Sequence, residues 1–242
     1  MPSNFVWYEL MTTNAKAAAG FYRKVVGWKA DDAAMPGMDY TLLKAGEAPM
    51  AGLMDMPKEA KGAGAMPGWM GYVGVDNVDA YVGRVTKAGG AVHMPATDIP
   101  NVGRFATVAD PQGAVFSLFT PGDGPPPTQP EAGTPGTIGW RELMAGDGDK
   151  VFAFYAGLFG WTKAEAIDMG PMGKYQLFAA GAEPIGGMMT KPAEMPMPAW
   201  CYYFQVDAIG AATERLKSAG GKVVNGPMEV PGGSWIVQGI DP

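Results

Sequence analysis

Residues 5–28 read FVWYELMTTNAKAAAGFYRKVVGW, and this stretch decides the fold. It opens with a run of apolar and aromatic residues that is typical of a strand at 5–11, interrupted by one acid, Glu9. Asn14 is a favourable helix N-cap and Gly27 a favourable helix end. Between them, apolar residues recur at the spacing of one helical face: Ala18, Phe21, Tyr22, Val25 and Val26. The stretch therefore predicts a strand followed by a helix.

The same plan returns 133 positions later, where residues 138–161 read IGWRELMAGDGDKVFAFYAGLFGW. Trp-x-Glu-Leu-Met, Phe-Tyr and Gly-Trp all recur in register, and Val151, Phe154, Tyr155, Leu158 and Phe159 repeat the helical stripe. Other matches keep nearby offsets, such as MPGWMGYVGVD at 66–76 with MPAWCYYFQVD at 197–207. Small loop insertions explain the drift in offset, so we interpret the chain as two homologous halves.

Each half contains the plan twice. Three strand-like runs follow the first helix, and a new strand at 70–75 is followed by a second helix and three more runs. The pattern predicts four βαβββ modules. We expect a first domain at 1–120, with modules at 5–55 and 69–119, a Pro/Gly-rich linker at 121–136 and a second domain at 137–242. Asp241-Pro242 matches Asp110-Pro111, which precedes the last strand of the second module, so the last strand of the second domain is expected to be missing.

Composition excludes several classes of function. Apolar residues make up 47% of the 242 residues and charged residues 17%, which allows a sizeable core. The net charge of −6 and the lack of a basic run argue against nucleic acid. No apolar run approaches about 20 residues, and no export signal opens the chain, so we expect a cytoplasmic protein that does not enter a membrane. One cysteine, Cys201, excludes an internal disulfide.

Tandem βαβββ modules, with FYRKVVGW after the first strand and DPQG at 110–113 before the last, resemble the vicinal oxygen chelate superfamily. That group includes glyoxalases, bleomycin-resistance proteins and extradiol dioxygenases. The resemblance implies an α+β fold with two glyoxalase/bleomycin-resistance-like domains, in which curled mixed sheets surround clefts. Because this fold hosts several chemistries, it does not by itself define an activity.

The resemblance also implies where metal ligands would stand. Metal-dependent members carry His, Gln or Glu at these places, because such N and O ligands suit divalent metals. The corresponding positions here are Trp7, Gly52 or Leu53, Met70 and Ser117 in the first half, and Trp140, Gly187 or Met188 and Cys201 in the second. No set offers even two good ligands. We therefore expect no metal in either cleft, and no cofactor.

The acids beside the two tryptophans are the candidate chemical groups. Alternate residues of a strand share a face, so Glu9 should face the cleft with Trp7, and Glu142 with Trp140. The same rule places Tyr72 with Met70 and Tyr203 with Cys201. Each acid is a candidate general acid/base or an anchor for a ligand. Further candidates for ligand binding are Tyr40, Arg104, Ser117, Tyr175 and Trp235.

A purely architectural role for the two acids stays open at this point, through backbone N–H groups or a nearby arginine. Arg141 adjoins Glu142 but should point to the opposite face. The preferred hypothesis is a metal-independent protein that binds a small aromatic or heterocyclic molecule, as a monomer or weak homodimer. The alternatives are a glyoxalase-like lyase or dioxygenase-like oxidoreductase, and a regulatory or interaction protein with degenerate clefts.

Overall fold

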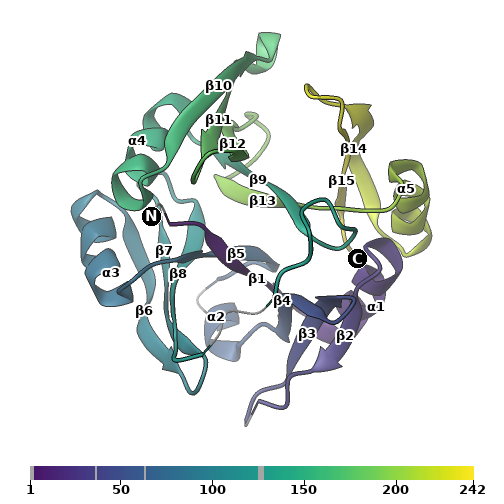
Figure 1. The fold of residues 1–242 in the computed structure, drawn as a ribbon, viewed down its shortest axis with the longest axis horizontal. Helices are drawn as coiled ribbons and strands as arrows, with labels where there is room; N and C mark the ends of the chain where they lie inside the picture. Colours follow the sequence, from purple (N-terminus) through teal and green to yellow (C-terminus); the bar gives the residue numbers. More distant parts are fainter. Residues whose placement is uncertain (1–2, 36, 63, 125–127) are drawn as a thin grey trace. The chain divides into compact units, whose positions relative to one another are not determined.

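The computed structural model describes residues 3–35, 37–62, 64–124 and 128–242 (Figure 1). Residues 125–127 of the predicted linker lie outside the described residues. No helix in the described part is long and apolar enough to cross a membrane. The elements, in chain order, are β1 (Phe5–Thr12), α1 (Ala15–Val25), β2 (Lys29–Asp32), β3 (Tyr40–Ala45), β4 (Ala48–Asp55), α2 (Lys58–Gly62), β5 (Gly68–Gly74), α3 (Val78–Lys87), β6 (Ala91–Ile99), β7 (Gly103–Ala109), β8 (Val115–Pro121), β9 (Ile138–Ala145), α4 (Gly148–Phe159), β10 (Thr162–Asp168), η1 (Gly170–Met172), β11 (Lys174–Ala179), β12 (Pro184–Thr190), β13 (Ala199–Phe204), α5 (Ile209–Ser218), β14 (Lys222–Glu229) and β15 (Trp235–Ile240).

This element order confirms the α+β fold of βαβββ modules. The first three modules are β1-α1-β2-β3-β4, β5-α3-β6-β7-β8 and β9-α4-β10-β11-β12, and the fourth contains β13, α5, β14 and β15. In each of the first three, the first and last strands pair in parallel, as β1 with β4, β5 with β8 and β9 with β12. The other described pairings within the modules are antiparallel, so the sheets are mixed.

The described residues pack into two compact units, and each unit draws on both halves of the sequence. Unit 1 comprises Met1–Tyr8, Trp69–Pro126 and Trp140–Tyr203, which hold the second and third modules. Unit 2 comprises Glu9–Gly68, Pro127–Gly139 and Phe204–Pro242, which hold most of the first and fourth modules. The domain bounds drawn from the repeat stay a prediction, because they describe sequence equivalence rather than packing.

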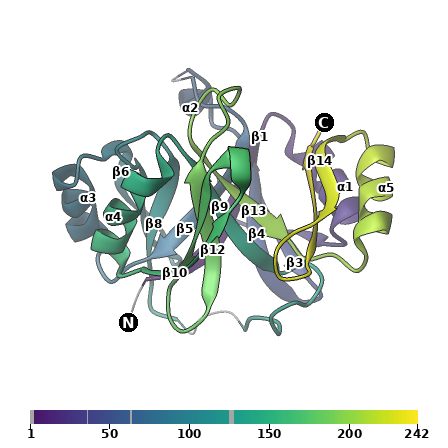
Figure 2. The ribbon, with the colours of Figure 1, turned by 90° about the horizontal axis from the view of Figure 1, so that it is seen from above.

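Unit 1 contains strands of two sheets and the helices α3 and α4. The strands run in the order β5-β8-β7-β6 in one sheet and β10-β11-β12-β9-β13 in the other. The helices α3 and α4 lie side by side in both views (Figures 1 and 2). The predicted stripe of α4 is buried as expected, and Tyr155 and Trp161 stack with ring centroids 5.6 Å apart. Burial of this aromatic cluster stabilises the unit.

A hydrogen bond in unit 1 explains why the Phe-Tyr and Asp-Pro motifs occur together. The Tyr155 hydroxyl donates to Asp110 Oδ2 over 2.9 Å and accepts the Trp200 indole N–H over 3.1 Å. Tyr155 and Asp110 are almost fully buried. Asp110 also accepts the backbone N–H groups of Gln112 and Ala114, which closes the Asp-Pro turn. Hydrogen bonds to a charged group contribute about 1.5–3 kcal/mol, so this contact ties the third module to the second.

Unit 2 repeats the same connections between the first and fourth modules. The Tyr22 hydroxyl donates to Asp241 Oδ2 over 3.0 Å. Arg215 on α5 donates to the Val25 carbonyl at the end of α1, and in unit 1 Arg84 on α3 donates to the Gly157 and Leu158 carbonyls at the end of α4. A cation is favourable at a helix C-terminus, where carbonyl groups lack partners in the helix. Figure 2 shows α1 beside α5.

Candidate functional site

Unit 1 brings three of the predicted site residues to the Glu142 carboxylate. Tyr175 donates its hydroxyl to Glu142 Oε2 over 2.9 Å, and Tyr203 donates to Oε1 over 3.0 Å. The Trp140 indole N–H donates to the Tyr175 oxygen over 2.7 Å. Glu142 is 8% exposed, whereas the tryptophan and the two tyrosines are half-buried. The result is a chain of hydrogen bonds on β9, in which the indole donates to a phenol and the phenol donates to the carboxylate.

A glycine makes this arrangement possible. Gly187 on β12 pairs with Glu142 on β9, and Tyr175 comes from β11 on the other side of β12. The Tyr175 ring crosses over Gly187 so closely that a Cβ built there would lie 2.2 Å from its Cζ atom. Only a residue without a side chain leaves room for a phenol to reach across one strand to the next. Gly187 and Tyr175 therefore act together in holding Glu142.

Burial controls the protonation of this cluster. Burial raises the pKa of Glu142, and the hydrogen bonds from Tyr175 and Tyr203 act in the opposite direction. Burial and the Glu142 charge raise the pKa of Tyr175, so this phenol keeps its proton and remains a donor. The same two causes raise the pKa of Cys201 to about 11. The cluster thus presents an acidic group held by neutral donors, beside a thiol that stays protonated at neutral pH.

Unit 2 contains the same device around Glu9. The Tyr40 hydroxyl donates to Glu9 Oε2 over 2.9 Å, and Glu9 on β1 pairs with Gly52 on β4. A Cβ at Gly52 would lie 1.7 Å from the Tyr40 hydroxyl oxygen, so this phenol also crosses a glycine. The combination of glutamate, glycine and tyrosine on three neighbouring strands therefore occurs once in each unit.

Two other predicted site residues meet in the second module. Ser117 is fully buried, and its hydroxyl lies 2.8 Å from Met70 Sδ and 3.1 Å from the Thr107 hydroxyl. Tyr72 is 5% exposed and packs against Phe105 and Phe119. Trp7 is half-buried on β1. Met70, Tyr72 and Ser117 thus form a mostly apolar patch with two hydroxyl groups.

The structure does not bring Arg104 to this patch. Arg104 and Thr107 are three residues apart on β7, which places them on opposite faces of the strand. Arg104 donates to Asp79 through two nitrogens and to Asp98 through a third. Trp235 lies on β15 of unit 2 with 54% of its surface exposed.

The residues at the family's metal-ligand positions do not suit a metal in unit 1. Trp140 offers only an N–H, which Tyr175 already accepts, and Gly187 has no side chain and lies under the Tyr175 ring. Cys201 would have to lose a proton whose pKa is about 11. Among the described residues, no group of three or more His, Cys, Asp or Glu side chains is placed to hold a metal ion.

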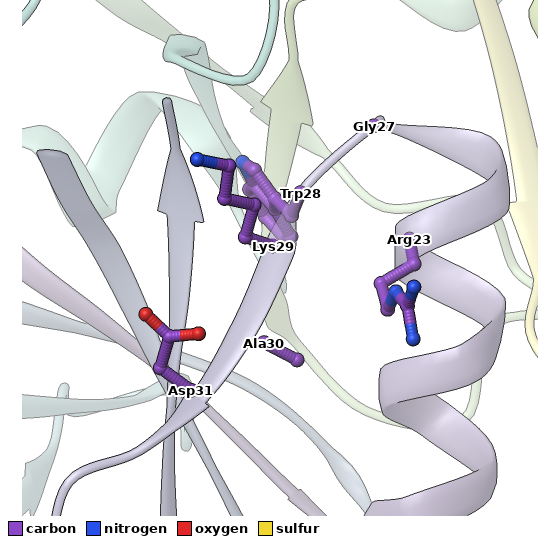
Figure 3. Close-up of a pocket in the computed structure, with 6 residues that line it drawn as sticks. All are labelled: Arg23, Gly27, Trp28, Lys29, Ala30 and Asp31. Carbon is purple, nitrogen blue, oxygen red and sulfur yellow. The ribbon is translucent and has the colours of Figure 1, made fainter. Parts of the chain in front are cut away.

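A surface groove in unit 2 is lined by none of the residues of the Glu9 cluster. Figure 3 shows Arg23 from α1 facing Lys29, Ala30 and Asp31 of β2, with Gly27 and Trp28 between them. Lys29 pairs with Glu47, and Asp31 pairs with Lys44. Trp28 is 2% exposed and donates its indole N–H to the Gly136 carbonyl, so it belongs to the core. The groove is therefore open surface between ion pairs.

Sequence reasoning missed the roles of the two glycines. Gly52 and Gly187 stand at matched positions, 135 residues apart, and Tyr40 and Tyr175 share this offset. The common offset is a signal that the glycine and the tyrosine belong to one device. Their contact with the glutamate depends on the register of three neighbouring strands, and the sequence repeat does not show that register.

Comparisons with known proteins agree with the duplicated βαβββ fold. The family model described as "Glyoxalase/Bleomycin resistance protein/Dioxygenase superfamily" matches residues 4–118 and 137–238. A Mycobacterium tuberculosis protein named "Putative glyoxylase CFP32" is 34% identical over 227 residues, which cover 93% of this chain and 85% of that protein. The "Anthracycline biosynthesis protein DnrV" of Streptomyces peucetius is 31% identical over 247 residues, covering 96% of this chain and 87% of that protein.

Two solved structures show the same fold at low sequence identity. The Mn(II)-bound glyoxalase from Novosphingobium aromaticivorans aligns with a TM-score of 0.60 at 18% identity, over 99% of this chain and 83% of that one. The 2,2',3-trihydroxybiphenyl 1,2-dioxygenase from Sphingomonas wittichii strain RW1 aligns with a TM-score of 0.62 at 14% identity, over 94% of this chain and 82% of that one. At these identities the likeness concerns the fold alone.

Proposed function

Because the chain belongs to the Glyoxalase/Bleomycin resistance protein/Dioxygenase superfamily, we propose that it is a small-molecule-binding protein that works without a metal ion. Its ligand is anchored by Glu142 in unit 1 and by Glu9 in unit 2. The observation that carries this proposal is the Glu142 cluster, in which two phenols hold a nearly buried carboxylate beside a half-buried tryptophan. Ligand sites are mostly apolar with a few placed polar groups, and this cluster has that composition.

The chemistry of the cluster defines what it can bind. Tyr175 and Tyr203 donate to Glu142, so their oxygens and the carboxylate offer lone pairs to a ligand. A hydroxyl, amide or amine of the ligand suits these acceptors, whereas a carboxylate or phosphate is repelled. The Trp140 ring supplies a flat surface for an aromatic or heterocyclic body. The relative named for anthracycline biosynthesis supports an aromatic ligand.

A thermal-shift screen of neutral and cationic aromatic compounds tests the proposal. A compound at about 100 times its Kd stabilises the folded protein by about 2.7 kcal/mol. We expect the best hits to lose this shift in Glu142→Gln together with Glu9→Gln, and to keep it in Arg104→Gln. Absence of any shift across a broad library contradicts ligand binding and favours an interaction protein with degenerate sites.

Metal independence has its own measurement. Protein purified without an affinity tag and analysed for nickel, zinc, iron and manganese should hold none of them in stoichiometric amount. One bound metal ion per unit contradicts this part of the proposal, because the ligand positions would then have to supply donors that Trp140 and Gly187 lack.

A metal-free lyase is the second candidate, and the raised pKa of Glu142 favours it. A glutamate of raised pKa exchanges protons more readily near neutral pH, as general acid/base catalysis requires. The relative named as a glyoxylase supports the same reaction class. Turnover of an α-ketoaldehyde–thiol adduct, lost when both glutamates are replaced by glutamine, separates catalysis from simple binding.

A further inference from the structure

Unit 1 contains a second polar cluster, on the face of β9 opposite Glu142. Arg141 is half-buried, and its Nε donates to the Tyr8 hydroxyl oxygen over 2.6 Å. Its guanidinium carbon lies 5.6 Å from the centre of the Tyr8 ring. Within the described residues Arg141 makes no ion pair with a carboxylate, and its two terminal nitrogens make no hydrogen bond. A guanidinium carries five N–H donors, so most of its donor capacity is unused.

Two phenols next to Arg141 also lack an acceptor. Tyr8 is 5% exposed; its oxygen accepts from Arg141, and no acceptor for its own hydrogen is found in the described part of the chain. The Tyr202 hydroxyl is buried and makes no hydrogen bond there. The Gly71 N–H faces the Tyr202 oxygen, but it can serve only a lone pair and leaves the hydroxyl hydrogen without an acceptor. Burial raises the pKa of both phenols, so both keep their protons.

The three donors lie close together. The rings of Tyr8 and Tyr202 meet edge to face with centroids 5.1 Å apart, and Phe5 packs against both. Tyr8 therefore contacts both other members of the cluster, because its oxygen accepts from Arg141 and its ring packs against Tyr202. A buried donor that stays without an acceptor destabilises the folded state. The cluster therefore combines one positive charge with a deficit of acceptors.

We infer that Arg141, Tyr8 and Tyr202 form a binding site for a small anion, such as a monocarboxylate. An anion accepts hydrogen bonds without donating any, which matches a cluster whose unsatisfied groups are all donors. A water molecule fits less well, because it would add two more hydrogens that need acceptors. The planar guanidinium suits the two oxygens of a carboxylate, and the phenols add charge-assisted hydrogen bonds.

Among the described residues the repeat supplies no second copy of this cluster, whereas the cluster of glutamate, glycine and tyrosine occurs twice. Arg141 matches Tyr8 in the repeat, and Tyr202 matches Gly71. The first half thus has neither a cation nor a second phenol at these positions. The site is also independent of the proposed ligand site, since Arg141 and Glu142 point to opposite faces of β9. The inference consequently does not depend on the proposed function.

Sodium formate is the probe that tests this site. We expect the Tm of the wild-type protein to rise with formate and to saturate. Tyr202→Phe should need at least fivefold more formate for half of the rise, and Arg141→Gln should lose the saturable rise. Arg104→Gln is the matched control, because it removes an arginine of the same unit that lies in ion pairs with Asp79 and Asp98, and it should respond as the wild type does.

Tyr202→Phe keeps the test decisive if Arg141→Gln does not fold. Removing a buried hydroxyl without an acceptor should leave the Tm in formate-free buffer unchanged or higher, so its loss of formate response cannot come from misfolding. A crystal grown with bromide should show an anomalous peak beside Arg141. The inference is overturned if formate gives no saturable rise in the wild type, or if both variants respond as the wild type does, which would mean that water satisfies the donors.

Discussion

Replacing Gly187 by alanine tests whether this glycine holds the Glu142 cluster together. The added Cβ would lie 2.2 Å from Tyr175 Cζ, 2.3 Å from Cε1 and 2.4 Å from the hydroxyl oxygen. Carbon atoms are in contact at about 3.5 Å, so the ring has to retreat by roughly 1 Å or more. This breaks the 2.9 Å hydrogen bond to Glu142. Loss of a hydrogen bond to a charged group costs about 1.5–3 kcal/mol, and it lowers the Tm by roughly 3–12 °C in a chain of this size.

Urea unfolding followed by circular dichroism measures the effect, and a double-mutant cycle isolates its cause. Gly187→Ala should cost stability in the wild-type background and close to nothing in Tyr175→Ala, where no ring stands in the way. Gly157→Ala in α4 is the matched control, because a Cβ there meets no atom within 4 Å, and it should be neutral or stabilising. An equal cost of Gly187→Ala with and without the Tyr175 ring would refute the steric reasoning.

Three further predictions concern the same units. Cys201 is the one cysteine of the chain, and burial together with the Glu142 charge raises its pKa to about 11. Because the thiolate is the reactive form, Glu142→Gln should lower this pKa and speed the reaction of Cys201 with Ellman's reagent at pH 8 about two- to tenfold. Burial raises the pKa of Glu142 above its usual 4.5, so the folded state binds this proton more tightly than the unfolded state does. The free energy of unfolding of the wild type should therefore fall, relative to that of Glu142→Gln, as the pH rises above 4.5. Urea unfolding at several pH values measures this difference. An unchanged difference between the two proteins from pH 4 to 8 would contradict this. Tyr155→Phe should lower the free energy of unfolding in urea by about 2–4 kcal/mol, because Asp110 and the Trp200 N–H lose a buried partner. Tyr22→Phe should cost less, because its partner Asp241 is half-buried.

Local sequence patterns were sufficient to predict helices and strands and to predict which residues of β9 share a face. The capping residue Asn14 accepts from the Ala17 N–H, and the apolar stripe of α1 is buried, because both features depend only on residues within one helix. The alternation rule correctly placed Glu142 with Trp140, since both reach Tyr175. It also correctly turned Arg141 to the other face, where it meets Tyr8.

Contacts between strands could not be predicted, because they depend on register and on which modules pack together. The Tyr175–Glu142 contact spans β11, β12 and β9, and it requires that Gly187 stands opposite Glu142. Arg104 is a ligand-binding candidate in the sequence, whereas in the structure it pairs with Asp79 on α3. The packing of α3 against β7 cannot be predicted from the strand pattern. Likewise, the repeat equates Tyr22 with Tyr155 but gives no sign that each bonds the Asp-Pro turn of another module.

The internal repeat shows which residues are the same at matched positions of the two halves and which differ. Glutamate, glycine and tyrosine stand at matched positions in both units, whereas Met70 is matched by Cys201 and Tyr8 by Arg141. Steric coupling explains the retained set, because a side chain at Gly187 expels Tyr175, and loss of Tyr175 removes a donor from a nearly buried carboxylate. Retention therefore does not by itself demonstrate a ligand. Glu142→Gln is the substitution that decides, since it keeps the shape of the side chain while removing the charge that a bound amine or hydroxyl would use.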